Sequence, residues 1–341
     1  MTATPQRMAR LMLAISVLSV CFLDFGAYRQ AHLASPNAWM DVIRGTADAP
    51  QQYRVGVVGT AFWLSQHLAL GMHYCLTLLD TASLLIAVMS LLRILERTEV
   101  YRDSRVELQW FGAAAFVVLV QYYLAWLFYL QRPETLPTAM LIALTLWLWQ
   151  LDPVTGMRRG AIVVGLLGLA LLQSLVRADI ACLLNLGIFV ATLTPLGKKL
   201  SLPRALAAAT SLAAALAAGG VQLYLARVAY PDATYGRVKM WQLRPNLIHA
   251  TRWPPFILFM LPVVWTIGQV VRRRFAGDAP GVALLAGAVA YAALWVTIGK
   301  IDEVRIFLPF ALALAPLTVE MAVLRAGGTR AGKRLEGIRQ E

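Results

Sequence analysis

The stretch GAIVVGLLGLALLQSLVRADIACLLNLGIFVATLTPL, residues 160–196, carries only two charged side chains, Arg177 and Asp179. A helix that crosses a membrane needs about 20 residues, so this stretch is roughly twice as long as one crossing requires. Charged residues inside such a run are costly in hydrocarbon and favour a turn at the membrane surface. We therefore expect two helices, 160–176 and 179–196, with almost no loop between them.

The same apolar character extends along the rest of the chain. Of its 341 residues, 59% are hydrophobic and 14% are charged, whereas a soluble domain has about 25% charged residues. The composition predicts an all-α integral membrane protein in which residues 1–341 form a single polytopic domain. Apolar runs predict about ten spans, at 9–26, 73–94, 108–129, 136–151, 160–176, 179–196, 204–225, 255–271, 280–298 and 305–324.

The positive charge is concentrated in short connections. A net charge of +13 would suggest nucleic-acid binding in a soluble protein, but basic loops orient membrane proteins toward the cytoplasm. With ten spans, Arg158-Arg159, Lys198-Lys199, Arg272-Arg273-Arg274 and the tail 325–341 share one side with the N-terminus. We predict that both termini are cytoplasmic, that the protein lies in a bacterial-type inner membrane, and that it has no nucleic-acid partner.

The opposite, outer side holds the first and fourth outer loops, at about 27–72 and 226–254, and all four histidines. Long loops in compact folds often carry function, so a site is expected to face the periplasm or exterior. Residues 55–72 are predicted to lie along the outer interface as a helix or to enter the membrane and return. Two crossings between 55 and 94 would place the basic tail outside, against the charge bias.

Asp24 is the first candidate for chemistry, because it lies at the outer end of the first predicted helix. A carboxylate that is partly desolvated yet accessible suits a general base. An interfacial acid paired with Arg29 is the alternative interpretation. Asp41 and Asp48 in the first loop compete for the same role.

A second cluster, Gly299-Lys300-Ile301-Asp302-Glu303-Val304-Arg305, separates the last two predicted spans. Charged groups between two apolar helices must pair with each other or bind a charged ligand. Lys300 and Arg305 are suited to holding a phosphate, and a solvated turn with internal ion pairs is the alternative. The long outer loops supply two further candidate cations, Arg54 and Arg244.

Other residues are candidates for accessory roles. Asp80 lies inside a predicted span, where an acid is functional by default unless it is held by hydrogen bonds. Arg177 and Asp179 form the tight turn, and His73 is the histidine best placed to be buried. Neither the histidines nor the three cysteines show metal-ligand spacing, and nucleotide-binding and serine-hydrolase motifs are absent.

The segment Asp24-Phe25-Gly26-Ala27-Tyr28-Arg29-Gln30-Ala31 resembles the GT-C superfamily of membrane glycosyltransferases, in the branch that begins with a D-F-x-x-Y-x-x-A pattern. The turn with Glu303 and Arg305 before Phe307-Leu308-Pro309 is also similar to this group. The resemblance implies transfer of a sugar from a polyprenyl-phosphate donor to a glycan, lipid or protein acceptor at the outer face. It also implies that Asp24 is the catalytic base.

The resemblance further implies that loop cations bind the lipid phosphate, which we assign to Lys300, Arg305, Arg54 and Arg244. Residues with possible accessory roles are Tyr28, Arg29, His73, Asp80, Arg177, Asp179 and Glu303. No cofactor is required by this chemistry, although a divalent metal is compatible with it. A transporter or flippase for a lipid-linked glycan is the main alternative, and an acyltransferase or polymerase acting on surface glycans is another. An acyltransferase would need a buried histidine such as His73.

Overall fold

The computed structural model describes residues 4–35, 39–129, 132–151, 155–234, 241–273 and 277–327. Within these ranges the secondary structure is helical and includes no strand. The helices are α1 Pro5–Ala34, α2 Met40–Arg44, α3 Val55–Leu68, α4 Met72–Arg97, α5 Glu99–Arg102, α6 Val106–Leu124, α7 Thr135–Trp149, α8 Gly156–Thr192, α9 Arg204–Tyr224, α10 Leu243–Ile248, α11 Trp253–Arg272, α12 Ala279–Ile298, α13 Leu308–Ala313 and α14 Ala315–Ala326.

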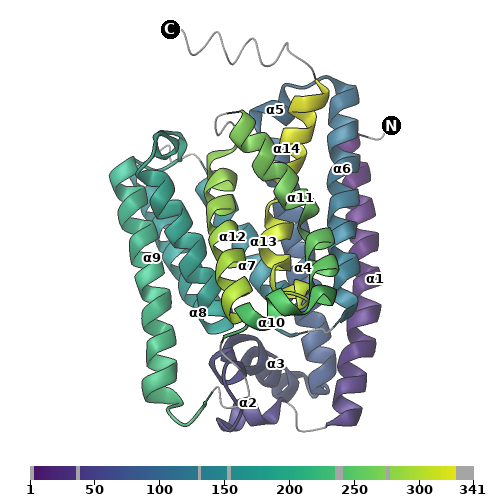
Figure 1. The fold of residues 1–341 in the computed structure, drawn as a ribbon, viewed down its shortest axis with the longest axis vertical. Coiled ribbons are helices and arrows are strands. Elements are labelled where there is room, and N and C mark those ends of the chain that lie inside the picture. The colour runs from purple at the N-terminus through teal and green to yellow at the C-terminus, as the bar shows by residue number, and fades with distance from the viewer. Residues whose placement is uncertain are drawn as a thin grey trace.

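The long helices lie side by side in one bundle, with short helices at its ends (Figure 1). Helices α2, α3 and α10 cover one end, which we call the α3 end. Helix α5, the start of α1 and the end of α14 lie at the opposite end, which we call the α5 end. The start of α1 is attached there by the bond from Arg10 Nη2 to Glu96 Oε1 at 2.7 Å.

Seven helices in the described residues are long and apolar enough to cross a membrane, as an all-α, multi-pass membrane protein requires. Helix α7 is apolar but shorter, at 15 residues. The count of ten crossings and the cytoplasmic side of the termini stay predictions. Most of the basic tail, residues 328–341, lies outside the described residues. The seven candidates are 5–34, 72–97, 106–127, 156–192, 204–229, 250–272 and 279–298.

Helix α8 contains the turn expected within residues 160–196. Arg177 has a non-helical backbone, with φ −152° and ψ 85°, and two helices meet there. Before the turn, Gly165 lies against Leu148 near the end of α7. After the turn, Gly187 lies against the first half of α12. The chain therefore runs to the α3 end, turns at Arg177 and runs back.

Two boundaries differ from the predicted spans. Helix α1 continues to Ala34 rather than stopping near residue 26, so the first part of the predicted outer loop is helical. The predicted span 305–324 consists of a short 3₁₀ turn, α13 and α14, which are separated at Leu314. Prolines at the starts of α13 and α14 explain the separation, because proline cannot donate an intrahelical hydrogen bond.

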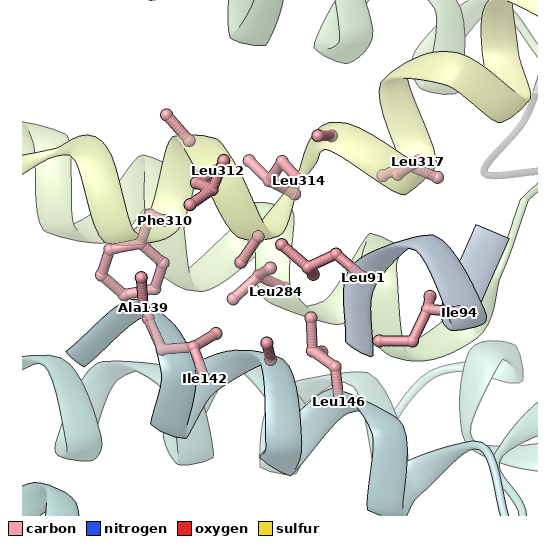
Figure 2. Close-up of a cluster of buried hydrophobic side chains, with 14 of the residues drawn as sticks. Leu91, Ile94, Ala139, Ile142, Leu146, Leu284, Phe310, Leu312, Leu314 and Leu317 are labelled. Atoms are coloured by element: carbon pink, nitrogen blue, oxygen red, sulfur yellow. The ribbon is translucent and has the colours of Figure 1, made fainter. Parts of the chain in front are cut away.

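The last apolar segment forms the centre of the bundle. Almost every residue from Val304 to Leu324 is buried, and Figure 2 shows side chains of α13 and α14 beside those of α4, α7 and α12. The outer helices instead expose large apolar side chains, including Phe22 at 79%, Val164 at 70% and Leu216 at 68%. Such surfaces suit contact with lipid.

Helices α8 and α12 approach closely through two glycines. A Cβ atom on Gly187 would lie 2.8 Å from the carbonyl oxygen of Ala283, and one on Gly287 would lie 2.8 Å from that of Leu183. Both distances are far shorter than van der Waals contact. In membrane proteins, where water does not drive helices together, such small residues allow the backbone contact that stabilises packing.

We expect Gly187→Ala to lower the stability of the protein by about 1–3 kcal/mol, because the added methyl group must separate α8 from α12. Gly168→Ala is the matched control, since a Cβ at Gly168 would meet no atom within 4 Å. The control should be neutral or stabilising by up to about 1 kcal/mol. Thermal unfolding of the two variants in detergent measures the difference, and equal melting temperatures would contradict the packing argument.

Candidate functional site

Asp24 lies on the wall of a large cavity at the α3 end. The cavity has a volume of about 1370 Å³ and is bordered by α1, α2, α3 and the end of α6. Asp24 belongs to the lining although only 2% of the residue is exposed. Asp41 and Asp48 line the same cavity but are exposed. Of these three acids, Asp24 is the one in a desolvated environment.

Tyr28, one turn after Asp24, connects this cavity to the buried Asp80. The Tyr28 hydroxyl donates a hydrogen bond of 2.6 Å to Asp80 Oδ2. Tyr28 is 2% exposed and Asp80 is fully buried. The nearby hydroxyls of Thr77 and Thr81 donate instead to carbonyl oxygens of their own helix. Asp80 of α4 therefore holds α1 in position through Tyr28. Because this partner belongs to another helix, the sequence around Asp80 does not reveal it.

A second cavity, of about 600 Å³, adjoins the first. Gln51, Arg54, Arg132 and Glu134 belong to the walls of both. Two of the cations that line the second cavity are buried, Arg177 at 4% and Arg305 at 8% exposed. Its charged lining consists of Arg54, Arg132, Arg177, Arg252, Lys300, Arg305, Glu134 and Glu303. Cations therefore outnumber carboxylates, and an anion is the ligand that this lining favours.

Arg54 and Glu134 form an ion pair between the two cavities, with Arg54 Nη1 donating to Glu134 Oε1. Burial alone would raise the pKa of Glu134, but the guanidiniums of Arg54 and Arg177 outweigh that effect and hold the pKa below its ordinary value. The pair joins the residue before α3 to the residue before α7. Glu134 was not among the predicted site residues, although it lies in the polar break Gln131-Arg132-Pro133-Glu134-Thr135.

Arg177 is held from two sides. Its Nε and Nη2 atoms donate to the two carboxylate oxygens of Asp179, at 3.1 and 2.5 Å. Its Nη2 atom also donates to the hydroxyl of Tyr291 in α12. The non-helical backbone of Arg177 allows Asp179, two residues later, to face the same guanidinium. The turn thus fixes a buried guanidinium, paired with Asp179, at the wall of the second cavity.

The segment 299–305 borders the second cavity and is contacted by Asn246 of α10 and by Arg252. Asn246 donates from Nδ2 to the carbonyl oxygens of Val296 and Gly299, at 2.9 and 2.7 Å. Arg252 donates to Asn246 Oδ1 at 2.9 Å and lies 3.8 Å from a carboxylate oxygen of Asp302. Asn246 was not predicted as part of a site, and Arg252 was only one of several candidate cations in the second long outer loop. Their role depends on contacts about 50 residues away in the sequence, which no local pattern reveals.

Glu303 and Arg305 pair within the same segment. Arg305 Nη2 donates to Glu303 Oε2 at 3.2 Å, and the 3₁₀ turn Val304–Ile306 places both beside the cavity. Lys300 is exposed at the cavity wall. The internal ion pair that the sequence offered as an alternative is present, and Lys300 and Arg305 also face the cavity. The two interpretations are therefore compatible.

Five of the predicted residues line neither cavity, namely Arg29, His73, Asp80, Asp179 and Arg244. Arg29 and Arg244 are exposed and line neither wall. His73 instead belongs to an aromatic cluster, with its ring 5.1 Å from that of His32 and 4.3 Å from that of Tyr74. A histidine stacked in this way is placed for packing rather than for acyl transfer in either cavity.

Within the described ranges, no group of three or more histidine, cysteine, aspartate or glutamate side chains is arranged to hold a metal ion. The described residues do place the buried Asp24 in the wall of a cavity that adjoins a second, cation-rich cavity. In comparisons with known proteins, no family model, no curated protein and no solved structure matches the chain.

We expect Glu134→Gln to lower the free energy of unfolding by about 1.5–3 kcal/mol, because the guanidinium of Arg54 loses a charged hydrogen-bond partner in a half-buried position. Asp103→Asn is the matched control. It breaks the pair between Arg102 and Asp103, in which both side chains are about 60% exposed, and it should cost less than about 1 kcal/mol. Chemical unfolding in detergent at neutral pH measures both changes.

The difference in the free energy of unfolding between wild type and Glu134→Gln should also depend on pH. The pKa of Glu134 is lowered in the folded protein, so its stabilisation is complete above the unfolded value of about 4.3 and disappears as the pH falls through the lower folded value. The free energies of unfolding of the two proteins should therefore differ by a constant amount from neutral pH down to about 5. They should converge as the pH falls below about 4. Convergence that is already complete near neutral pH would contradict the assignment.

Proposed function

We propose that this protein is a membrane glycosyltransferase that moves a sugar from a polyprenyl-phosphate donor to an acceptor at the α3 end. The observation that carries the proposal is the junction of two cavities. One has the buried residue Asp24 in its wall, and the other has six cationic side chains and two carboxylates in its lining. A base and a phosphate site in neighbouring cavities that share wall residues suit transfer from a sugar phosphate.

The cationic cavity supports the choice of a phosphate-linked donor. Arg177 and Arg305 are buried charges with fixed partners, and Lys300 and Arg132 are exposed at the same wall. Guanidiniums bind phosphate oxygens through paired hydrogen bonds, and in a desolvated site such contacts stabilise charge strongly. Leu, Ile and Val side chains exposed on the surrounding helices suit a donor that arrives from the lipid.

Asp24 is proposed as the base because it combines burial with access to the larger cavity. In the reaction, its carboxylate removes the proton of an acceptor hydroxyl as that oxygen forms a bond to the anomeric carbon. The bond between the anomeric carbon and the phosphate oxygen breaks at the same time. Polyprenyl phosphate leaves with the electron pair, and the cations of the second cavity stabilise its charge. A single displacement inverts the configuration at the anomeric carbon.

The residues shared by the two cavities have a positioning role in this proposal. The Arg54–Glu134 pair lies where the sugar must pass between donor and acceptor cavities. The Tyr28–Asp80 bond fixes the face of α1 that carries Asp24. A volume of about 1370 Å³ for the acceptor cavity is above the range of about 300–1,000 Å³ that is usual for small-molecule sites, which suits a glycan, a lipid headgroup or a peptide loop.

We expect Asp24→Asn to reduce the transfer rate by about 10²–10⁴-fold, the usual contribution of a general base. The assay uses purified protein in detergent with a radiolabelled polyprenyl-phosphate sugar and a membrane extract as the source of acceptor. Asp41→Asn and Asp48→Asn are matched controls from the same cavity and should retain most of the activity. A folded Asp24→Asn protein with full activity would refute its role as the base.

Arg305→Gln and Lys300→Gln should raise the KM for the donor by about tenfold each, since each removes a charged contact to the phosphate. Arg244→Gln is the control, because Arg244 is an exposed cation at the same end that lines neither cavity. If all three substitutions have equal effects, the cations act as a general surface field instead. Movement of the lipid-linked sugar across vesicle membranes without transfer would favour the flippase alternative.

A further inference from the structure

A third cavity, of about 610 Å³, lies at the α5 end, away from the site described above. It is bordered by the end of α4, the short helix α5, the end of α7 and the start of α8. Three arginines, Arg97, Arg102 and Arg158, line it together with Gln150. The remaining wall is apolar and consists of Leu148, Leu151, Ala161 and Ile162. No carboxylate in the described residues belongs to this wall.

The described residues neutralise the charges of this cavity only in part. Arg102 pairs with Asp103 at 3.1 Å. The nearest carboxylate on α4, Glu96, is bonded to Arg10 at 2.7 Å and lies 4.0 Å from Arg93. Within the part of the chain that the structure describes, Arg97 and Arg158 form no ion pair. Instead, the guanidinium of Arg97 lies over the ring of Trp147, 6.0 Å from its centre.

The surroundings of the cavity are those of a membrane boundary. On the first turns of α8, Met157 is 87% exposed and Val164 is 70% exposed, and side chains of this kind belong in lipid. Trp147, which supports Arg97, is of the residue type enriched at the membrane–water interface. Basic side chains above an apolar wall at this level match the two parts of a phospholipid, its charged headgroup and the start of its acyl chains.

We propose that this cavity binds the phosphodiester headgroup of an anionic phospholipid, with the guanidiniums of Arg97 and Arg158 on the phosphate oxygens. Arg102 forms the outer edge of the site. The apolar wall of Leu148, Leu151 and Ile162 contacts the glycerol and the first methylene groups. The site lies at the end that the charge pattern predicts to be cytoplasmic, where anionic lipids attract basic side chains. It does not depend on the proposed transferase activity.

The test compares lipid binding by the full-length protein in mixed micelles containing phosphatidylglycerol or phosphatidylcholine. Wild type should bind phosphatidylglycerol at least about tenfold more tightly, and Arg97→Gln, Arg102→Gln and Arg158→Gln combined should remove that preference. The control combines Arg93→Gln, Arg105→Gln and Arg159→Gln, which remove the same charge at the same end without touching the cavity wall. The control should keep the preference within about twofold.

The binding measurements would overturn the proposal if wild type showed no preference, or if both triple variants lost it equally, which would indicate a diffuse surface field. Millimolar inorganic phosphate should not displace the lipid, and displacement would assign the cavity to free phosphate. Because the cavity variant must fold to be informative, a photoactivatable phosphatidylglycerol is also crosslinked to wild type. Labelling should concentrate in residues 148–162, and labelling spread evenly over the basic segments would refute the site.

Discussion

A charge buried among apolar helices must find partners inside the protein, and the guanidinium of Arg177 shows how this requirement shapes the α3 end. With 4% of the residue exposed, Arg177 has little water to solvate it. Asp179 and the Tyr291 hydroxyl supply the missing hydrogen bonds. The first partner requires a break in the helix at Arg177, and the second requires α12 to lie beside that break. The turn of α8 and the position of α12 are thus tied to one side chain.

The same requirement explains why the candidate site lies where chain breaks meet. Glu134 precedes α7, Arg54 precedes α3, and Arg305 lies in the turn before α13. Each is at an interruption of an apolar helix, where charges can be satisfied by neighbouring backbone and side chains. Because these interruptions gather at one end of the bundle, their charges border common cavities. The site is a consequence of where the helices stop.

The sequence predicted helical class, the turn at Arg177 and most helix positions, because these depend on local apolar periodicity and on isolated charges. It placed the end of α1 too early, because Arg29, Gln30 and His32 are typical of a loop, although a helix can continue beyond the membrane with polar side chains. It also treated 305–324 as one regular span. Composition alone does not show that prolines divide this segment or that it forms the buried centre.

The candidate site was predictable only as a set of residues and not as an arrangement. Asp24, Lys300 and Arg305 were identified from their positions beside apolar runs, and each lines one of the two cavities. Glu134 and Asn246 were missed because their partners are distant in sequence, as with the separation of 80 positions between Arg54 and Glu134. Arg244 has the right charge in the right loop, yet it is exposed outside both cavities. Charge and hydropathy therefore locate the end of the bundle at which a site forms, whereas long-range pairing decides which side chains face it.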